Sequence, residues 1–365
     1  MEPAACLSNQ EFIRHFNAKA SRQRIPVSGS IDLTHRCNLR CVHCYLGDAS
    51  RHADPGKEMT TGRILSVIDE ITDAGCLFLL ITGGEPLLRK DFSEIYGHAK
   101  KKGLVVTVFT NGTLLSGEML DLFEDLPPRC IEISLYGATP ETYESITGVD
   151  GSYEKCLSGI RSLVGRGISV RLKTILMTLN NHEFYDIEGF AKELGVKFRF
   201  DAAVFPRMDG DKSPMSLRVS AEQAVGKEFS DAGRVLSWEK YFRECLGQEP
   251  SDRLYSCGAG LTGFHIDPYG RLKPCVMVDD VQFDLSEGEF LTGWHNVISQ
   301  IRYKRAEYVN GCNSCEKRHL CGFCPAFFQM ETGSENVRSE YLCSMGSHRH
   351  ELILNRISMG DRSAA

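Results

Sequence analysis

The sequence predicts an α/β fold in which an open barrel with a parallel sheet precedes a smaller, metal-binding domain. Three observations lead to this prediction. Six short apolar runs, rich in β-branched residues, alternate with segments of helical periodicity in the first part of the 365-residue chain. A polar stretch at 206–214 then interrupts this pattern. Beyond it, eight of the 15 cysteines lie between Cys245 and Cys343.

Short β-branched runs of this kind are typical of buried strands. The six runs cover 31–34, 77–82, 104–110, 130–135, 168–176 and 197–203. The segments between them have helical spacing: in 61–74, for example, Ile64, Ile68 and Ile71 fall on one stripe. Cap-forming residues such as Thr60 precede several of these segments.

Strands that alternate with helices form parallel sheets, and right-handed crossovers curl such a sheet. The predicted first domain is therefore a partial (β/α)6 barrel of the TIM type, with its chemistry at the carboxyl ends of the strands. The cysteine-rich segment lacks continuous periodicity, so we expect it to fold around metal. The predicted division is an N-terminal extension at 1–26, the barrel at 27–225, the cysteine-rich domain at 226–350 and a tail at 351–365.

Bulk composition excludes several classes of partner and location. The net charge of −6 has mixed signs and gives no extended positive field, so neither a nucleic-acid nor a membrane partner is expected. The longest apolar run, 76–81, is far shorter than the roughly 18 residues of a membrane span. The first residues carry no secretory signal. We therefore expect a soluble, cytoplasmic protein, whose cysteines serve metal binding or catalysis rather than disulfides.

The first cysteine group follows the first predicted strand directly. Cys37, Cys41 and Cys44 form a C-x3-C-x2-C loop. One interpretation is a zinc site, with His35 or His43 as the fourth ligand. The other is a 4Fe–4S cluster held through three irons, with its fourth iron open to a ligand. The spacing favours the cluster.

This loop resembles the signature of the radical S-adenosylmethionine (radical SAM) enzymes, in which an aromatic residue, here Tyr45, follows the last cysteine. The second predicted strand ends in a sequence that is similar to the family's GGEP motif, which contacts the amino group of SAM. Its residues are Gly83, Gly84 and Glu85. Glycines allow a backbone to approach a ligand closely, and a carboxylate suits an ammonium group.

Other strand ends carry further matches to the family. The resemblance implies that Ser134 binds the ribose of SAM and that Asn111 lines the same pocket. It also implies that Lys173 or Lys155 pairs with the SAM carboxylate. Tyr136 stands where the family usually has Asp. The sequence points to no catalytic acid or base.

The C-terminal cysteines resemble those of the SPASM domain, a module of one radical SAM branch that includes peptide maturases and anaerobic sulfatase maturases. The last central spacing is two residues here, where the family has three. The resemblance implies two auxiliary 4Fe–4S clusters, so that the enzyme would hold three in all. One would be held by Cys312, Cys315, Cys321 and Cys343, and the other by Cys257, Cys275 and Cys324.

The fourth ligand of the second auxiliary cluster is open at this point: Cys245 is the candidate, and an open iron or a non-cysteine ligand is the alternative. For the C-terminal segment alone, a pair of zinc knuckles is a comparable interpretation. The chain as a whole thus predicts a radical SAM barrel with a C-terminal iron–sulfur (SPASM) domain.

The resemblance implies an oxidoreductase that reductively cleaves SAM to a 5′-deoxyadenosyl radical and oxidatively modifies a peptide or protein side chain. Crosslink or thioether formation and side-chain oxidation are the implied reactions, with auxiliary clusters as electron acceptors. A small-molecule dehydrogenase or a cofactor-biosynthesis enzyme is the alternative, followed by a non-catalytic zinc or iron–sulfur scaffold. Implied partners are a peptide or small protein substrate, flavodoxin or ferredoxin as electron donor, and a separate leader-peptide-binding protein.

Overall fold

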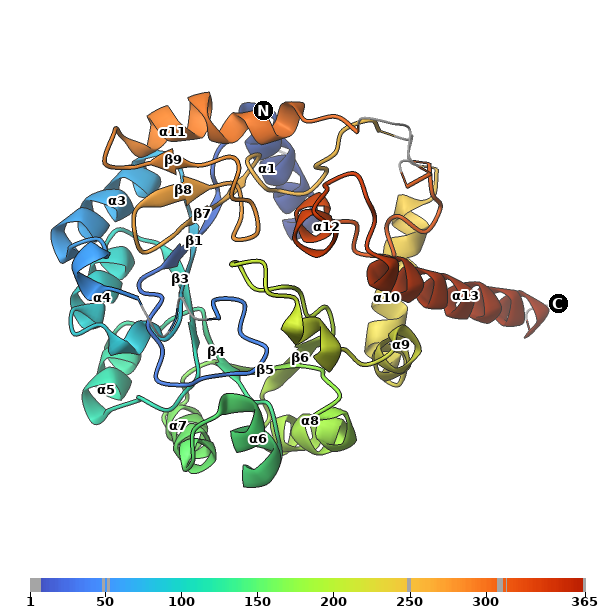
Figure 1. Cartoon of the computed structure of the whole chain (residues 1–365), viewed down its shortest axis with the longest axis horizontal. Coiled ribbons are helices and arrows are strands. Elements are labelled where there is room, and N and C mark those ends of the chain that lie inside the picture. Colours follow the sequence, from blue (N-terminus) through green and yellow to red (C-terminus); the bar gives the residue numbers. More distant parts are fainter. Residues whose placement is uncertain are drawn as a thin grey trace, which may run out of the picture.

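The computed structural model has the predicted α/β class, with a curved sheet inside and helices outside (Figure 1). It describes residues 8–47, 50, 53–247, 251–306, 311–312 and 314–363. None of the helices in this part of the chain combines the length and the apolarity needed to cross a bilayer.

All six predicted strands are present, and they pair in parallel in chain order. They are β1 (Ser28–Asp32), β2 (Phe78–Thr82), β3 (Val105–Thr110), β4 (Cys130–Ser134), β5 (Val170–Ile175) and β6 (Lys197–Asp201). The predicted partial (β/α)6 barrel is therefore confirmed.

The sheet does not end at β1. Its order is β6-β5-β4-β3-β2-β1-β7-β8-β9, so that β7 (Gly263–Ile266) pairs in parallel with β1. The strands β8 (Arg271–Lys273) and β9 (Phe283–Asp284) follow as an antiparallel extension. Residues that the sequence assigned to the cysteine-rich domain thus continue the wall of the barrel.

Helices of the barrel lie along the outer side of the sheet (Figure 1). They are α3 (Thr61–Asp73), α4 (Phe92–Lys101), α5 (Gly117–Asp125), α6 (Pro140–Thr147), α7 (Ser152–Gly165) and α8 (Phe184–Glu193). The other helices are α1 (Asn9–Gln23), α9 (Ala221–Phe229), α10 (Ala232–Cys245), α11 (Phe290–Asn296), α12 (Pro325–Thr332) and α13 (Glu340–Ser363). Of these, α11 joins the barrel helices beside α3, while α9, α10, α12 and α13 gather on the other side of the molecule, beyond β6 (Figure 1).

Short 3-10 helices occupy several loops of the chain. They are η1 (Pro55–Lys57), η2 (Pro86–Leu88), η3 (Asn181–Glu183), η4 (Ser213–Leu217) and η5 (Ile298–Tyr303). Of these, η2 and η3 bear on the functional site, because each carries or borders a carboxylate that holds a strand end in place.

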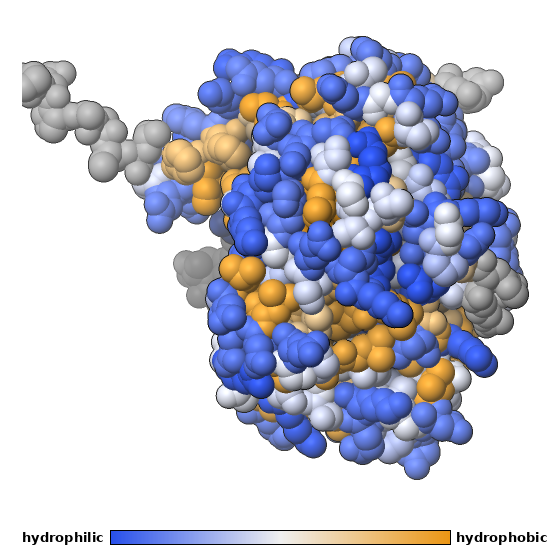
Figure 2. Space-filling view, turned by 90° about the vertical axis from the view of Figure 1, so that its left-hand side faces the viewer, coloured by the Kyte–Doolittle hydropathy of each residue, from blue (hydrophilic) through white to orange (hydrophobic). Residues whose placement is uncertain are grey.

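Amphipathic helices bury one stripe against the sheet. In α3, Ile64, Ile68 and Ile71 are fully buried as predicted, and Thr60 caps the helix by accepting a hydrogen bond from the Arg63 amide. The face shown in Figure 2 is mostly hydrophilic, with hydrophobic residues gathered in a band across it. Burial of the apolar stripes supplies most of the stabilisation of such helices.

The junction of β1 with β7 requires a glycine. Gly29 lies opposite Phe264 in the register of the two strands. A Cβ atom at Gly29 would lie 2.1 Å from Cζ of Phe264, well inside van der Waals contact. The Phe264 ring is buried and packs on the Phe290 ring at a centroid distance of 4.8 Å, so it has little room to move.

We predict that Gly29→Ala lowers the free energy of unfolding by about 1–3 kcal/mol, because the added methyl group overpacks this junction. Urea denaturation followed by circular dichroism measures the change. Gly189→Ala is the matched control: Gly189 lies within α8, a Cβ there would meet nothing within 4 Å, and the variant should be neutral or stabilised by up to about 1 kcal/mol. Equal stability of the two variants would contradict the prediction.

Candidate functional site

A cavity of about 340 Å³ opens at the carboxyl ends of the strands, where the sequence placed the chemistry. Most of the residues predicted to bind SAM and its cluster line it. They are Cys37, Cys41, Cys44, Tyr45, Gly83, Gly84, Asn111, Ser134 and Lys173. Segments far apart in sequence are thus brought to one chamber, which is the arrangement that a cofactor site needs.

The three thiols of the first cysteine group lie together in this cavity. Burial raises the pKa of Cys41 well above its usual range, and the neighbouring thiols of Cys44 and Cys37 raise it further. Burial likewise raises the pKa of Cys37 to about 12. These thiols are therefore protonated at neutral pH in the metal-free protein, and they must release protons when a metal centre binds.

The two glycines that follow β2 hold the cysteine loop by close backbone contact. The Gly84 amide donates to the Thr34 carbonyl at 2.7 Å, and the Glu85 amide donates to the Arg36 carbonyl at 2.8 Å. A Cβ at Gly83 would lie 2.3 Å from the Thr34 oxygen, and Gly83 has a φ of 131°. Glycine is required here for contact with the cysteine loop as well as for any approach to a ligand.

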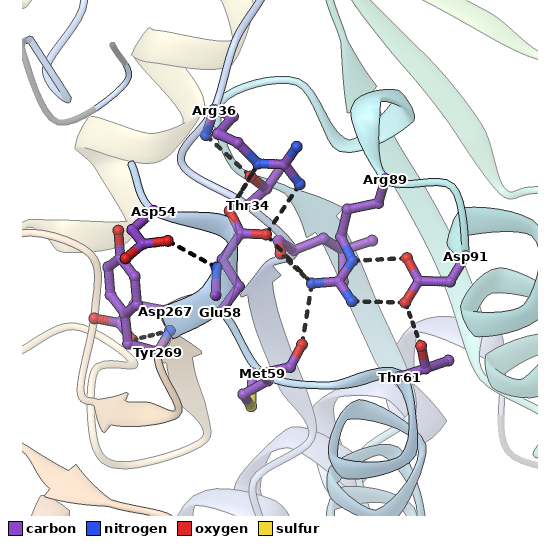
Figure 3. A network of polar contacts seen from close by, with 12 residues as sticks. Thr34, Arg36, Asp54, Glu58, Met59, Thr61, Arg89, Asp91, Asp267 and Tyr269 are labelled. Atoms are coloured by element: carbon purple, nitrogen blue, oxygen red, sulfur yellow. Dashed lines mark hydrogen bonds and ion pairs between the residues drawn. The ribbon is translucent and has the colours of Figure 1, made fainter. Parts of the chain in front are cut away.

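A buried ionic network fastens the same loop from its other side (Figure 3). Glu58 accepts a hydrogen bond from the Thr34 hydroxyl and pairs with Arg36 at 3.1 Å. Arg89 donates to the Leu33 and Met59 carbonyls at 3.2 and 3.1 Å. It also pairs with Asp91 at 2.6 Å. The start of the cysteine loop is thereby tied to the segment that follows the GGEP turn.

The structure places Glu85 differently from the sequence interpretation. Glu85 is fully buried and does not line the cavity. Its carboxylate accepts hydrogen bonds from the Asn111 amide at 2.7 Å, the Thr110 hydroxyl at 2.8 Å and the Leu87 amide at 3.1 Å. Burial raises its pKa to about 7 despite these bonds. In this structure Glu85 orders the ends of β2 and β3, and an ammonium group in the cavity would meet the Gly83–Gly84 backbone first.

Asn111 connects the end of β3 to the cysteine loop. Its side-chain amide donates to Asn38 Oδ1 at 2.8 Å and lies 3.9 Å from the Cys37 sulfur. Asn38 in turn donates to the Thr113 hydroxyl at 2.8 Å. A hydrogen bond to sulfur stabilises the thiolate, so Asn111 lowers the pKa of Cys37 slightly against the effect of burial.

The two candidate lysines differ in position. Lys173, on β5, is half-buried in the cavity wall with its Nζ 3.7 Å from the centroid of the Phe109 ring. Burial lowers its pKa to about 7, and the nearby Arg199 charge lowers it further. Lys155 is exposed on α7 and is absent from the cavity lining. Of the two, Lys173 is therefore placed to meet a ligand in the cavity.

Sequence reasoning missed other residues of the cavity. Asp32 and Ser30 on β1, Phe109 on β3 and His265 on β7 also line it. A signal existed for the β1 pair: alternate residues of a strand share one face, and two polar residues on the inner face of a buried strand are unusual. No comparable signal existed for His265, because the pairing of β7 with β1 is a long-range event.

Seven of the other cysteines form two further groups. Burial raises the pKa of Cys275 to about 12, and the thiols of Cys324 and Cys257 contribute to the shift. In the second group, burial raises the pKa of Cys321 to about 11, and the neighbouring thiols contribute to the shift. That group consists of Cys321, Cys312, Cys315 and Cys343.

Cys245 is the last residue of α10, where it contacts Tyr241.

The donor chemistry of all three groups fits iron–sulfur clusters. Among the described residues, no three His, Cys, Asp or Glu side chains converge tightly enough to enclose a single metal ion. Each group consists of three or four thiols, and a 4Fe–4S cluster takes each thiolate on a different iron.

The loop after β4 is held by a carboxylate. Glu183 accepts hydrogen bonds from the Ala138 amide at 2.6 Å, from the Thr139 amide and hydroxyl at 3.2 and 2.6 Å, and from the Thr142 hydroxyl at 2.7 Å. Burial alone would raise the pKa of Glu183, but these bonds lower it below 4.5. They fix the strand end that presents Ser134 and Tyr136 to the cavity.

We predict that Glu183→Gln lowers the free energy of unfolding at neutral pH by about 1.5–3 kcal/mol, the usual value of hydrogen bonds to a charged group. Since the pKa is lower in the folded state, this contribution is present above pH 4.5 and is lost as the pH falls through the folded value. The wild type and the variant should therefore converge in urea denaturation at acid pH. Glu141→Gln, an exposed change in α6, should show no such gap.

Comparison with known proteins places this architecture in a family. Residues 31–194 match the model of the Radical SAM superfamily. The chain is 30% identical over 365 residues to the antilisterial bacteriocin subtilosin biosynthesis protein AlbA of Bacillus subtilis (strain 168), a match that covers 93% of this chain and 77% of AlbA. It is 27% identical over 335 residues to the AdoMet-dependent heme synthase of Methanosarcina barkeri, covering 83% of this chain and 92% of that protein.

A solved structure extends the likeness to the C-terminal part. The crystal structure of Streptococcus suis SuiB bound to S-adenosylmethionine superposes with a TM-score of 0.70 at 17% identity, covering 93% of this chain and 84% of SuiB. The shared fold therefore includes the cysteine-rich segment beyond the barrel. By its sequence and its fold, the chain belongs to the radical SAM superfamily, in the branch of maturases with a C-terminal SPASM domain.

Proposed function

We propose that this protein is a peptide maturase that binds SAM at a 4Fe–4S cluster on Cys37, Cys41 and Cys44 and oxidatively modifies a peptide side chain. When bound, the cluster and SAM supply a 5′-deoxyadenosyl radical that removes a hydrogen atom from the substrate. The observation that carries the proposal is the grouping of these three thiols inside the cavity at the strand ends. The chain's own contribution is to position the reactants and exclude water.

Each cavity residue has a proposed part in holding SAM. The Gly83–Gly84 backbone offers polar groups for the amino group, and Lys173 offers a cation for the carboxylate. Ser134 is proposed to bind the ribose, while Asn111 orients the Cys37 sulfur and Tyr45 closes the cavity beside the cluster. Glu85 supports this arrangement indirectly, through the ends of β2 and β3.

Relatives and cavity size both favour a peptide. AlbA is a bacteriocin biosynthesis protein, and SuiB has also been solved bound to its precursor peptide SuiA. The cavity volume of about 340 Å³ is at the lower end for small-molecule sites. SAM would take up most of this volume, so most of a peptide would lie outside.

Cofactor biosynthesis is the second candidate function. It is favoured by the match to the AdoMet-dependent heme synthase, which covers 92% of that protein. A tetrapyrrole would need considerably more room than a single side chain, so this function would require the cavity to widen. Turnover of an iron porphyrin in place of peptides would establish it.

We further propose two auxiliary 4Fe–4S clusters in the C-terminal part. One would be held by Cys257, Cys275 and Cys324, with Cys245 or a non-cysteine group as the fourth ligand. The other would be held by Cys312, Cys315, Cys321 and Cys343. Their proposed role is to accept the electron that substrate oxidation leaves behind. We assign the barrel to 27–225 and the SPASM domain to 226–350 on this basis.

The proposed reaction also implies an electron donor, a partner protein and a cellular location. Reductive SAM cleavage needs a low-potential donor, for which we propose flavodoxin or ferredoxin. A separate protein is proposed to bind the leader of the peptide substrate. A reducing, cytoplasmic location suits a protein whose described cysteines form no disulfides with one another.

We predict that the anaerobically reconstituted protein contains about twelve irons with matching sulfide, as three 4Fe–4S clusters require. With SAM and dithionite it should release 5′-deoxyadenosine, and mass spectrometry of a pooled synthetic peptide library should show a product that has lost mass in units of two hydrogens. Cys41→Ala should abolish SAM cleavage and remove about four irons. Cys76→Ala changes a buried thiol outside the three groups, and this variant should retain SAM cleavage and the full iron content. Stoichiometric zinc with little iron in the wild type would contradict the proposal.

We predict that Lys173→Met weakens SAM binding to the reconstituted protein by about 1.5–3 kcal/mol, tenfold or more in Kd, because a charge-assisted bond is lost. Isothermal calorimetry measures this. Lys173 has a pKa of about 7 and must be charged to pair with a carboxylate, so wild-type affinity should fall as the pH rises above 7. Lys155→Met is the matched control and should bind as wild type; equal effects of the two changes would refute the assignment.

A further inference from the structure

Asp32 is a buried carboxylate without a hydrogen-bond partner. It lies at the carboxyl end of β1, is 0% exposed to bulk solvent, and lines the cavity that contains the three thiols. Neither of its carboxylate oxygens accepts a hydrogen bond. Among the described residues that line this cavity, it is the one carboxylate.

Two imidazole rings lie near this carboxylate, but neither donates a hydrogen bond to it. Nε2 of His265 lies 3.7 Å and Nε2 of His35 lies 3.4 Å from Asp32 Oδ2. The other nitrogen of His265, Nδ1, is hydrogen-bonded to the Ser30 hydroxyl at 2.9 Å, which fixes the orientation of the ring. Burial lowers the pKa of His265, so the ring is neutral at physiological pH and does not cancel the charge of Asp32.

Other buried carboxylates of the chain are well supplied with partners. Glu132 pairs with Arg171 and Arg199, each at 2.7 Å. Glu85 accepts three hydrogen bonds and stays out of the cavity. A buried carboxylate that lacks such partners costs several kcal/mol of stability in general. Such groups persist at functional sites, where a ligand supplies the missing interaction.

We propose that Asp32 is the proton acceptor of substrate oxidation and that His265 positions it; this inference rests on the proposed function. A hydrogen atom leaves a substrate C–H bond for the SAM-derived radical. A neighbouring N–H, O–H or S–H bond then gives its proton to Asp32, the remaining electron passes to an auxiliary 4Fe–4S cluster, and a new bond forms between the carbon and the heteroatom. The substrate loses two electrons and two protons in total.

The position of Asp32 suits this role. Ser30 and His265 are register partners on β1 and β7, so the acceptor stands at the seam between the barrel and the C-terminal strands. Tyr45, beside the cluster ligand Cys44, is near enough for the Asp32 charge to raise its pKa further after burial. A substrate that enters the cavity beside the SAM site would therefore meet Asp32 in the same cavity.

The test compares Asp32→Asn with wild type on a synthetic peptide that the wild type converts. Loss of a general base should slow product formation by about 10²–10⁴-fold. 5′-Deoxyadenosine release and binding of the fluorescein-labelled peptide to the metal-free protein should stay close to wild type, so the ratio of 5′-deoxyadenosine to product rises. His265→Gln should give a smaller rise in the same ratio, as expected of a positioning residue. Unchanged product formation in Asp32→Asn would overturn the proposal.

A second measurement separates this role from a structural one. Asp32→Asn removes an unpartnered buried charge, so the metal-free variant should unfold at an equal or higher urea concentration than wild type. Glu132→Gln is the matched control: it breaks two ion pairs and should unfold at a lower concentration. A lower midpoint for Asp32→Asn would show a structural role and overturn the proposal. Absence of SAM cleavage in the wild type would instead refute the proposed function itself.

Discussion

The close backbone contact between Gly83–Gly84 and Thr34–Arg36 is the constraint on which the site depends. It brings the end of β2 against the start of the cysteine loop at hydrogen-bond distance, which a side chain at either glycine would prevent. The ionic network around Glu58 and Arg89 then holds the loop from the opposite side. Cys37, Cys41 and Cys44 reach the cavity because both contacts fix the loop that carries them.

The second constraint is the addition of β7 to β1. It converts part of the cysteine-rich segment into barrel wall, and it requires Gly29 to admit the ring of Phe264. Because His265 follows Phe264 on the same strand, this packing also delivers an imidazole to the cavity beside Asp32. The cavity is therefore lined by both parts of the chain, as the proposed reaction with cofactors in both would require.

Three buried carboxylates have different roles in this protein, and the hydrogen-bond donors around each one account for the difference. Glu183, with four donors, is a structural anchor whose pKa is lowered. Glu85 is fully buried and accepts three hydrogen bonds. Its pKa rises to about 7, because burial disfavours the charged form more than the hydrogen bonds stabilise it. Asp32 has no hydrogen-bond donor at all and faces the cavity. A group left unsatisfied in the folded protein is available to a reactant.

The sequence by itself determined the barrel, its six strands and the residues of the first thiol group, because local periodicity and cysteine spacing are encoded over short distances. The resemblance of its motifs to a known family also led to nine residues of the cavity lining, among them Ser134 and Lys173. Only the tertiary structure decided the rest. It buried Glu85 outside the cavity lining, placed Lys173 but not Lys155 in that lining, and paired β7 with β1 so that His265 lies beside Asp32. All three depend on contacts between different elements, which no local pattern records, and the contact of Ser30 with His265 joins residues 235 apart in the sequence.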